Sequence, residues 1–519
     1  MFVDGRSLSQ NAVVGGDICI VGGGAAGITL ARDLAGEGRR IVVLESGGLE
    51  PEGKTQDLYE GETAGQSFTP LVVDRIRCLG GSTNHWAGYC RPFDQIDFEE
   101  RLATPGWPFG REELDPFYDR AQSLCQLGPF DYDPQHWTEG AVKPFIFATG
   151  SRLTNGVQQL SPPTNFGVVY RADLERASAT AVHLHSNAVD IETDPDGGHV
   201  TAVQAACLDG LRFTVRAKLY VLAVGGIENP RLLLNCEKTW KRGLGNAHDL
   251  VGRYFMDHPF VAEAAQVAFS TNYPELKFYG ERTVRGVRIY GHFYASGDTL
   301  RKEELPGFAI GMMQGSLPNA ELAGASLRDI QGAISSGRIP DHLGYRAGRI
   351  WAGVEWHLAN WWNRFMPGTP SYYTTSYISG VPPDPDSRVT LIDRRDSLGL
   401  RQAKLEWRLP ADFASNMRRA HQLLAQDLGI AGLGRVKLKT TTDSEIDVVN
   451  AHHHMGTTRM HPDPRQGVVD ANCRLHGVAN LFVAGSSVFP TYSFDNPTLT
   501  LVALALRLSE HLKRELRKV

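Results

Sequence analysis

The 519-residue sequence lacks several features that mark other classes of protein. Its seven cysteines include no Cys-x-x-Cys pair, and their odd number argues against a complete disulfide framework, so we expect reduced thiols. The longest apolar stretch, residues 499–508, is too short to cross a bilayer. The first 16 residues contain no apolar core of a secretory signal. These absences predict a cytoplasmic protein with no membrane partner.

Basic clusters are also scarce. Lysine and arginine are dispersed except in residues 513–518, and the formal net charge is −5. We therefore expect no nucleic-acid partner. With 42% hydrophobic residues, the chain is long enough to hold the cores of two or three domains, and its length is compatible with a monomer or a homo-oligomer.

The strongest positive signal is one complete βαβ unit in residues 16–48. An apolar strand at 17–21 leads into the glycine-rich turn 22–27, a helix is expected at 28–34, and a second apolar strand follows at 40–44. A glycine turn alone is weak evidence, and it can serve only to close a parallel sheet. Here the strands, turn and helix occur in the order that a dinucleotide-binding unit requires, so we predict a bound dinucleotide.

The glycines and the acid of this unit have separate roles. Gly22 permits the tight turn, Gly24 lets the backbone approach a pyrophosphate, and Gly27 lets the helix pack closely against the strand. Glu45 follows Gly22 by 23 residues, near the roughly 20 residues expected for a partner of the ribose hydroxyls. Since an acid there repels the 2′-phosphate of NADP, the pattern predicts that the bound dinucleotide is FAD or NAD.

Other segments predict further elements. The apolar run 219–224, which ends in Gly225-Gly226, has the pattern of another buried parallel strand. A helix is expected from about Asp115, and residues 388–408 are typical of a hairpin with a turn at Gly399. Residues 350–365 would be an amphipathic helix whose tryptophans either pack on a sheet or stack on sugar rings.

The C-terminal region carries the second strong signal. It contains the histidine run Asn450-Ala451-His452-His453-His454-Met455-Gly456-Thr457 and the helix start Asn496-Pro497-Thr498-Leu499-Thr500. Asn496 is expected to be the N-cap of that helix and Pro497 its first residue. A metal site shared by the consecutive histidines is not expected, because neighbouring side chains of an extended run point to opposite faces.

Taken together, these motifs resemble the glucose-methanol-choline (GMC) family of FAD-dependent oxidoreductases. The resemblance rests on the βαβ unit, the Gly80-Gly81-Ser82 segment, the two C-terminal segments and residues 251–259, VGRYFMDHP. The middle of the chain matches only loosely. The pairing of a histidine segment with an Asn-Pro helix start is most similar to the sugar-oxidising branch that includes pyranose oxidases, whereas other branches carry a second histidine at the position of Asn496.

The resemblance implies a chemistry for the C-terminal pair. His453 would remove the hydroxyl proton of an alcohol, and Asn496 would hydrogen-bond the same hydroxyl while the hydride passes to flavin N5. A neutral imidazole accepts a proton at neutral pH.

The expected activity is oxidation of a secondary alcohol of a sugar or glycoside to a keto-sugar. The alternatives are another alcohol, such as an aminocyclitol, nucleoside, sterol or lipid alcohol, or a flavin-dependent lyase reaction. A non-catalytic FAD-binding protein is a further alternative, and the electron acceptor would be O2 or a quinone.

The resemblance also implies which residues hold FAD. They are Gly22, Gly24, Ala25, Ala26, Gly27, Glu45, Ser46, Arg77, Gly81, Ser82, Asn84, His85, Trp86, Val189, Ala223, Gly225, Gly485, Pro497 and Thr498. His85 falls where fungal pyranose oxidases carry a histidine bonded covalently to the flavin. The Ser-Thr-Asn order before it differs from theirs, so both a covalent link and simple packing on the flavin edge stay open.

The fold implied is α/β, with a Rossmann-type FAD-binding domain and an inserted α+β substrate domain built on a mainly antiparallel sheet. The FAD-binding domain is expected in three pieces, residues 1–100, 166–261 and 446–519. Residues 101–165 would connect it to the substrate side, and residues 262–445 would form the substrate-binding domain.

Overall fold

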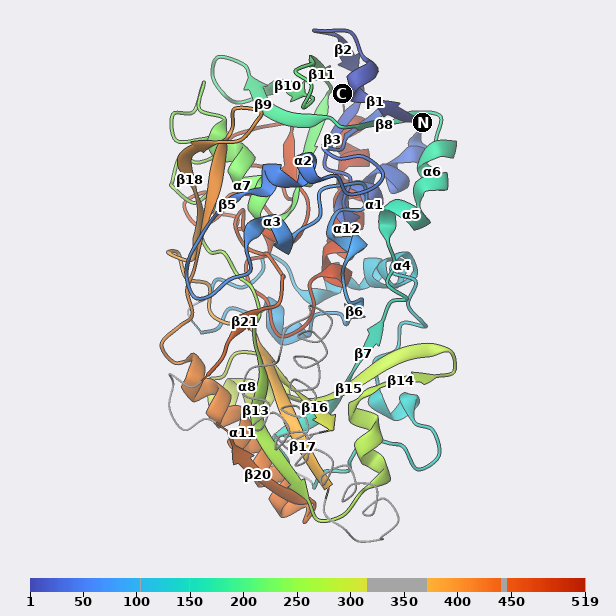
Figure 1. The fold of residues 1–519 in the computed structure, drawn as a ribbon, viewed down its shortest axis with the longest axis vertical. Coiled ribbons are helices and arrows are strands. Elements are labelled where there is room, and N and C mark those ends of the chain that lie inside the picture. The colour runs from blue at the N-terminus through green and yellow to red at the C-terminus, as the bar shows by residue number, and fades with distance from the viewer. Residues whose placement is uncertain (103, 149, 315–370, 440–445, 519) are drawn as a thin grey trace, which may run out of the picture.

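The computed structural model describes residues 1–102, 104–148, 150–314, 371–439 and 446–518 (Figure 1). Among these residues, no helix combines the length and the apolar character needed to cross a membrane. The tryptophan-rich segment 350–365, for which the sequence predicts a helix, lies outside the described residues.

A six-stranded parallel sheet occupies the upper half of the molecule (Figure 1). Every neighbouring pair in it is parallel. In sheet order the strands are β1 (Phe2–Asp4), β8 (Thr180–Leu184), β4 (Ile41–Leu44), β3 (Ile18–Val21), β12 (Leu219–Leu222) and β22 (Leu481–Val483). Every residue of the four strands β4, β3, β12 and β22 is buried, as expected for a parallel sheet covered on both faces.

The first βαβ unit forms as the sequence predicts. Strand β3 leads through the glycine turn into α1 (Ala25–Leu34), and the chain returns as β4, parallel to β3. Gly22 has a φ of +109°, which only glycine adopts without strain. A Cβ on Gly27 would lie 1.9 Å from the carbonyl oxygen of Gly22. Helix and strand therefore approach more closely here than any other residue would allow.

Helices cover this sheet. α1 contacts the C-terminal helix α12 (Thr498–Leu516), and α12 also contacts α4 (Asp115–Leu124), the helix expected from Asp115. The other α-helices of the described residues are α2 (Gly53–Gln56), α3 (Leu71–Asp74), α5 (Phe166–Val169), α6 (Arg171–Arg176), α7 (Gly225–Asn235), α8 (Gly297–Glu303) and α11 (Phe413–Ile430). α7 follows β12 directly, so the double glycine after that strand begins a helix.

Two smaller sheets flank the parallel sheet. The first contains, in order, β2 (Val13–Gly15), β11 (Arg212–Arg216), β10 (Val200–Ala206) and β9 (Asn187–Thr193). The second contains β18 (Arg388–Arg395), β19 (Arg401–Trp407) and β5 (Gly61–Gly65). β18 and β19 form the predicted antiparallel hairpin, and Gly399 lies in its turn with a φ of +90°.

The lower half of the molecule is built on a nine-stranded, mainly antiparallel sheet (Figure 1). Its main path is β20 (Gly434–Leu438), β13 (Pro259–Phe269), β17 (Ser371–Ser379), β16 (Phe308–Gln314), β15 (Val287–Ala295), β7 (Leu153–Leu160) and β6 (Tyr89–Cys90). β14 (Glu281–Val284) pairs with β15, and β21 (Val449–Asn450) pairs with β13. The fold class expected from the sequence, a parallel nucleotide-binding sheet joined to a large antiparallel sheet, is confirmed.

Candidate active site

A cavity of about 1010 Å³ lies where the parallel sheet meets the antiparallel sheet. The carboxyl ends of four parallel strands open into it, because the residues that follow β3, β4, β12 and β22 all line its wall. In open parallel sheets, ligands bind beyond the carboxyl ends of the strands. The nucleotide side of the cavity is therefore where the fold predicts it.

Glycines leave space along this wall. A Cβ added to Gly24, Gly225 or Gly485 would meet no protein atom within 4 Å, although all three line the cavity. Gly24 is also the N-cap of α1, and no side chain caps that helix. The free N–H groups of its first turn, at Ala25 and Ala26, suit an anion such as a pyrophosphate. These residues fit the phosphates of a dinucleotide.

Glu45 is buried at the end of β4 and has two roles in this geometry. Its Oε2 accepts a hydrogen bond from the backbone N–H of Gly23 at 2.8 Å, and its Oε1 accepts one from Gly47 at 2.8 Å. Burial raises the pKa of this carboxyl, against the hydrogen bonds that stabilise its charge. Oε1 also accepts from the Ser46 hydroxyl at 3.3 Å, whereas Oε2 keeps a second lone pair, and the side chain lines the cavity. Glu45 thus braces the glycine turn and can also accept from ribose hydroxyls.

A buried charge cluster lines the same end of the cavity. Arg75 lies 2.8 Å from one oxygen of Glu228, while Arg77 and Arg231 lie 3.5 and 2.9 Å from the other. Although burial alone would raise the pKa of Glu228, the charges of Arg231, Arg75 and Arg77 lower it to about 2. The guanidinium groups of Arg75 and Arg77 also stack over Tyr59, at 3.9 and 4.6 Å from its ring centroid.

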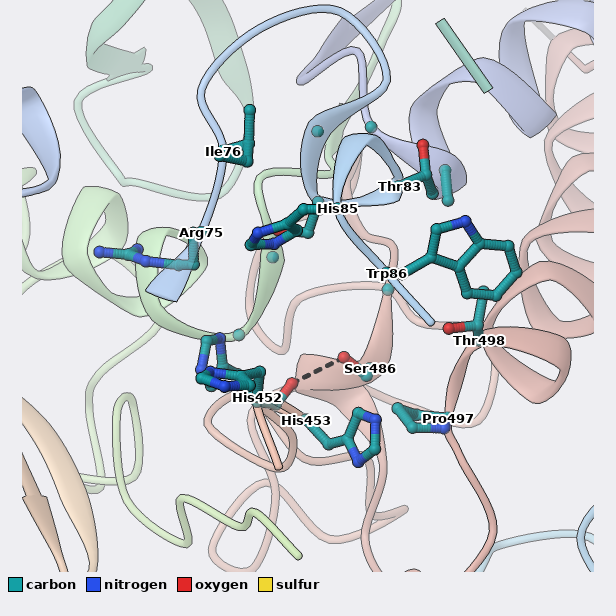
Figure 2. A pocket seen from close by; sticks show the side chains of 18 of the residues that line it. Arg75, Ile76, Thr83, His85, Trp86, His452, His453, Ser486, Pro497 and Thr498 are labelled. Atoms are coloured by element: carbon teal, nitrogen blue, oxygen red, sulfur yellow. Dashed lines mark hydrogen bonds between the residues drawn. The ribbon is translucent and has the colours of Figure 1, made fainter. Parts of the chain in front are cut away.

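Residues of the segment 81–88 line the cavity, and Thr83, His85 and Trp86 are labelled in Figure 2. Gly81, Ser82, Thr83, His85 and Trp86 line the wall. The indole N–H of Trp86 donates to the carbonyl oxygen of Thr164 at 3.1 Å, which holds the ring near Thr498.

Most of the residues expected to hold FAD line this one cavity, and three do not. Those that do are Gly22, Gly24, Ala25, Ala26, Glu45, Ser46, Arg77, Gly81, Ser82, His85, Trp86, Ala223, Gly225, Gly485, Pro497 and Thr498. Gly27 lies behind the turn, where it packs on Gly22. Asn84 points away from the cavity because its amide nitrogen donates to the carbonyl oxygens of Leu79 and Gly81. Val189 lines a separate surface hollow, while the preceding Ala188 lines the cavity.

The expected pair His453 and Asn496 meets at the cavity wall. Nδ2 of Asn496 lies 3.0 Å from Nε2 of His453, and both residues line the cavity. The prediction that Asn496 caps the last helix is wrong, because α12 begins at Thr498 with Pro497 in the cap position. The Asn496 amide makes its hydrogen bond to His453 instead.

Behind His453 lies a second imidazole, that of His258. Nδ1 of His258 is 2.8 Å from Nδ1 of His453, and Nε2 of His258 is 2.8 Å from the carbonyl oxygen of Ser493. Burial lowers the pKa of His258 to about 3. Burial, followed by the charges that His258, His454 and His452 would carry, also holds the pKa of His453 well below its ordinary value. Both rings are therefore neutral at neutral pH.

Asp257 joins these two rings through the backbone. Its Oδ1 accepts the backbone N–H of His258 at 2.7 Å and that of His453 at 2.9 Å. The ligand atoms of Asp257, His258 and His453 lie close enough together to hold a metal ion. However, two nitrogens bound to one zinc at about 2.0–2.1 Å each are more than 3 Å apart in tetrahedral geometry. The separation of 2.8 Å between the two Nδ1 atoms is that of a hydrogen bond.

The neighbouring histidines face the other way. His452 through Nδ1 and His454 through Nε2 both contact the buried carboxylate of Asp74. Burial opposes the charge of Asp74, but the two imidazoles hold its pKa well below the usual range. The backbone at His452 has a φ of +63°, and His453 contacts His258 and Asn496 while its two neighbours contact Asp74.

A second buried carboxylate precedes Asn496. Oδ2 of Asp495 lies 2.9 Å from Nη1 of Arg91, whose Nη2 lies 2.9 Å from Asp94. Arg91 and Asp495 are both buried. This pair anchors the loop that presents Asn496.

Sequence reasoning assigned no role to Asp74, Arg91, Asp257 or His258. Two of them, Asp257 and His258, lie in the 251–259 segment that carried the family resemblance, so that segment was the signal by which a role could have been sought. Asp74 and Arg91 carry no local signal, because each acts on residues that are hundreds of positions away in the chain.

The substrate side of the cavity is formed by the antiparallel sheet. β7, β13, β15, β16 and β17 each contribute to this wall. Its residues include Gln158, Phe260, Tyr290, Met312, Ser376 and Ile378. The ring of Tyr290 packs edge-on against Tyr89, with centroids 5.8 Å apart. Polar, aromatic and apolar groups therefore share this wall.

Comparisons with known proteins agree with this geometry. Two family models match the chain: "GMC oxidoreductase" over residues 383–505 and "FAD dependent oxidoreductase" over residues 17–235. The chain is 24% identical to 2-methyl-1,2-propanediol dehydrogenase of Mycolicibacterium austroafricanum, over 96% of this chain and 95% of that protein. It is 25% identical to the fructose dehydrogenase large subunit of Gluconobacter japonicus, over 98% of this chain and 100% of that protein.

Solved structures show the same fold. The crystal structure of pyridoxine 4-oxidase from Mesorbium loti superposes with a TM-score of 0.57 at 17% identity, over 96% of this chain and 99% of that chain.

Proposed function

Because the chain belongs to the GMC oxidoreductases, which use FAD to oxidise CH–OH donors, we propose that it oxidises a secondary hydroxyl of a sugar or glycoside to a ketone. The observation that carries the proposal is the contact of 3.0 Å between Asn496 Nδ2 and His453 Nε2 at the cavity wall. It places a proton acceptor and a hydrogen-bond donor where one hydroxyl can meet both.

His453 is the proposed base. Its Nε2 accepts the hydroxyl proton, and its lowered pKa keeps that nitrogen unprotonated at neutral pH. Asn496 donates its amide N–H to the hydroxyl oxygen and thereby orients the carbinol carbon. FAD, when bound, supplies the acceptor for the hydride of that carbon. The O–H proton therefore ends on His453, and the two electrons of the C–H bond leave with the hydride.

The substrate class follows from the antiparallel wall. Gln158 and Ser376 offer side-chain hydrogen bonds, and Tyr290 offers both a ring face and a hydroxyl. Sugar rings carry hydroxyls at their edges and C–H groups on their faces, so a wall of this composition suits them. The likeness to a fructose dehydrogenase supports the same class.

A small diol is a second candidate. The likeness to a propanediol dehydrogenase supports it, and so do the apolar side chains Phe260, Met312 and Ile378 on the same wall. A diol would leave the side chain of Gln158 without a partner, whereas a sugar could engage it, and Tyr290 and Ser376 already hydrogen-bond each other.

A substrate panel under anaerobic conditions tests the proposal. The FAD-loaded enzyme is mixed with hexoses, glycosides, polyols and short diols, and flavin absorbance is followed in a stopped-flow instrument. We expect hexoses or glycosides to bleach the flavin fastest. Fast bleaching by short diols alone would select the second candidate, and no bleaching by any carbohydrate would reject a sugar substrate. Admission of air, or addition of a quinone, then shows where the electrons go.

A further inference from the structure

The buried ring of His258 has a fixed donor and a fixed acceptor. Its Nε2 lies 2.8 Å from the carbonyl oxygen of Ser493, and a carbonyl oxygen only accepts. Nε2 therefore carries the hydrogen. Since the ring is neutral, its Nδ1 keeps an unshared pair and can only accept.

This assignment fixes the proton on His453. Nδ1 of His453 is the atom 2.8 Å from Nδ1 of His258, so it must be the donor of that hydrogen bond. A neutral His453 then has no hydrogen on Nε2, the nitrogen that receives the amide N–H of Asn496 at 3.0 Å. The three contacts are consistent with only one arrangement of protons on two neutral rings.

We infer that His258 is a positioning residue that holds His453 in the tautomer with Nδ1 protonated, which leaves Nε2 free to accept the substrate proton. The inference rests on the proposed function, in which His453 is the base, and adds the group that sets the protonation of its ring. When the substrate O–H bond breaks and an N–H bond forms at Nε2, Nδ1–H stays donated to His258. His258 passes no proton onward, because its own N–H remains on the Ser493 carbonyl.

Neighbouring residues fix the orientation of the His258 and His453 rings relative to each other. One oxygen of Asp257 accepts the backbone N–H of both residues, and the ring planes lie at 88° with centroids 4.9 Å apart. The Tyr492 ring packs edge-on against His258 at 4.8 Å. The other ionisable groups around the pair are His452, His454 and Asp74, which face the opposite side of the histidine run.

Three substitutions of His258 separate its two hydrogen bonds. In His258→Asn, the amide oxygen can take the place of Nδ1 and accept from His453. In His258→Gln, the amide nitrogen can take the place of Nε2 and reach the Ser493 carbonyl, but no acceptor faces His453. His258→Leu removes both. We expect anaerobic flavin reduction to slow by about 10²-fold in the Gln and Leu variants with little change in KM, and to stay within about 10-fold of wild type in the Asn variant.

Two further measurements distinguish tautomer control from a structural effect. ¹⁵N NMR of histidine-labelled protein, with His453 assigned from His453→Gln, should show an unprotonated Nε2 in wild type and a protonated one in the Gln variant. The rate loss should also persist at every pH from 6 to 9, because a tautomer is not restored by adding base.

The outcomes separate this inference from the proposed function. Flavin reduction at wild-type rate in His453→Gln would reject His453 as the base. If His453→Gln is inactive while the Asn and Gln variants of His258 react at equal rates, or if Nε2 of His453 stays unprotonated in the Gln variant, the role of His258 is overturned. Should the Leu variant fail to fold, the comparison of Asn with Gln still decides.

Discussion

Nδ2 of Asn496 lies 3.0 Å from Nε2 of His453, although 43 residues separate the two in the chain. One side chain can donate a hydrogen bond and the other can accept a proton, and both face the cavity. Each is anchored from behind by buried groups. His453 is held through His258 and Asp257, and the loop of Asn496 is held through Asp495 and Arg91. The geometry of the pair is therefore fixed before any substrate arrives.

Replacing Asn496 should reveal what its amide contributes. In Asn496→Ala the donor to the substrate hydroxyl is lost, and we expect flavin reduction to slow by about 10²-fold. In the isosteric Asn496→Asp the carboxylate favours a protonated His453, so the loss should be larger. Anaerobic stopped-flow spectroscopy measures both rates, and melting temperatures near that of wild type exclude unfolding. An Asp variant as fast as wild type would remove Asn496 from the mechanism.

The pH dependence of the wild-type enzyme follows from the lowered pKa of His453. An unperturbed histidine loses half of its base form near pH 6.5. A group with a lower pKa keeps the base form to more acidic pH, so kcat/KM for flavin reduction should be flat from pH 8 to 6.5 and fall only below. Enzyme held at each pH and assayed at pH 7.5 controls for inactivation. An acidic limb centred at or above pH 6.5 would contradict a buried, neutral base.

The charge cluster at the nucleotide end should matter for stability. Glu228→Gln leaves Arg75 buried without a carboxylate partner, whereas Arg231 keeps its pair with the buried Asp396. We expect the free energy of unfolding to fall by about 3 kcal/mol at pH 7. Glu237→Gln, which removes the same charge from an exposed pair with Arg401, should cost less than about 1 kcal/mol. Urea titrations of the FAD-loaded proteins measure both. Equal costs for the two variants would show that the buried cluster adds nothing.

The stability difference between wild type and Glu228→Gln should depend on pH in a defined way. The pKa of Glu228 is about 2 in the folded protein, below its ordinary 4.5. A depressed carboxyl pKa stabilises the folded state above the unfolded-state pKa, and this contribution is lost as the pH falls from 4.5 toward 2. The difference between wild type and Glu228→Gln should therefore be constant from pH 8 to about 5 and should shrink below pH 4.5. If the stability difference already shrinks between pH 8 and 6, the titration of another group must cause the pH dependence.

The substrate wall offers a test of specificity. Gln158 is buried in β7 and lines the cavity, and the described residues provide no hydrogen-bond partner for its side chain. Gln158→Leu should raise KM for the best sugar about 10-fold, which corresponds to one lost hydrogen bond of about 1.4 kcal/mol, with kcat nearly unchanged. KM for a short diol, which does not reach this group, serves as the control. A drop in kcat with constant KM would place Gln158 in the chemical step instead.

The sequence predicted features whose residues lie close together in the chain better than contacts between residues that are far apart in it. The glycine turn and Glu45 were predictable because the βαβ unit is local and its residues have fixed spacing. The hairpin at Gly399 was predictable for the same reason. The role of Asn496 as an N-cap was a wrong prediction, because α12 begins at Thr498 with Pro497 in the cap position, and capping preferences do not fix the first residue of a helix.

Long-range contacts set the rest of the site. His258 reaches His453 across 195 residues, and Asp74 reaches His452 across 378. No local sequence pattern shows either contact, because the fold brings together residues that are far apart in the chain. Val189 does not line the cavity, whereas its neighbour Ala188 does. The sequence pattern does not show which residues of β9 reach the cavity, because that depends on where the fold places the strand.

Two glycines of the first turn should respond differently to the same change. In Gly27→Ala the new Cβ would lie 1.9 Å from the backbone oxygen of Gly22, and backbone cannot yield cheaply there. We expect a large loss of stability and little folded protein. In Gly24→Ala the Cβ meets no protein atom within 4 Å but enters the space proposed for the pyrophosphate.

Gly24→Ala should therefore fold with an apoprotein melting temperature close to that of wild type while binding FAD much more weakly. The ratio of absorbance at about 450 nm to that at 280 nm reports FAD content, and thermal unfolding of the apoproteins reports the fold. Gly36→Ala, at a site in the same βαβ unit where a Cβ also meets nothing, is the matched control and should change neither quantity. Full FAD content in Gly24→Ala would show that the cofactor's phosphates bind elsewhere, since a methyl group at this position cannot coexist with an anion resting on the first turn of α1.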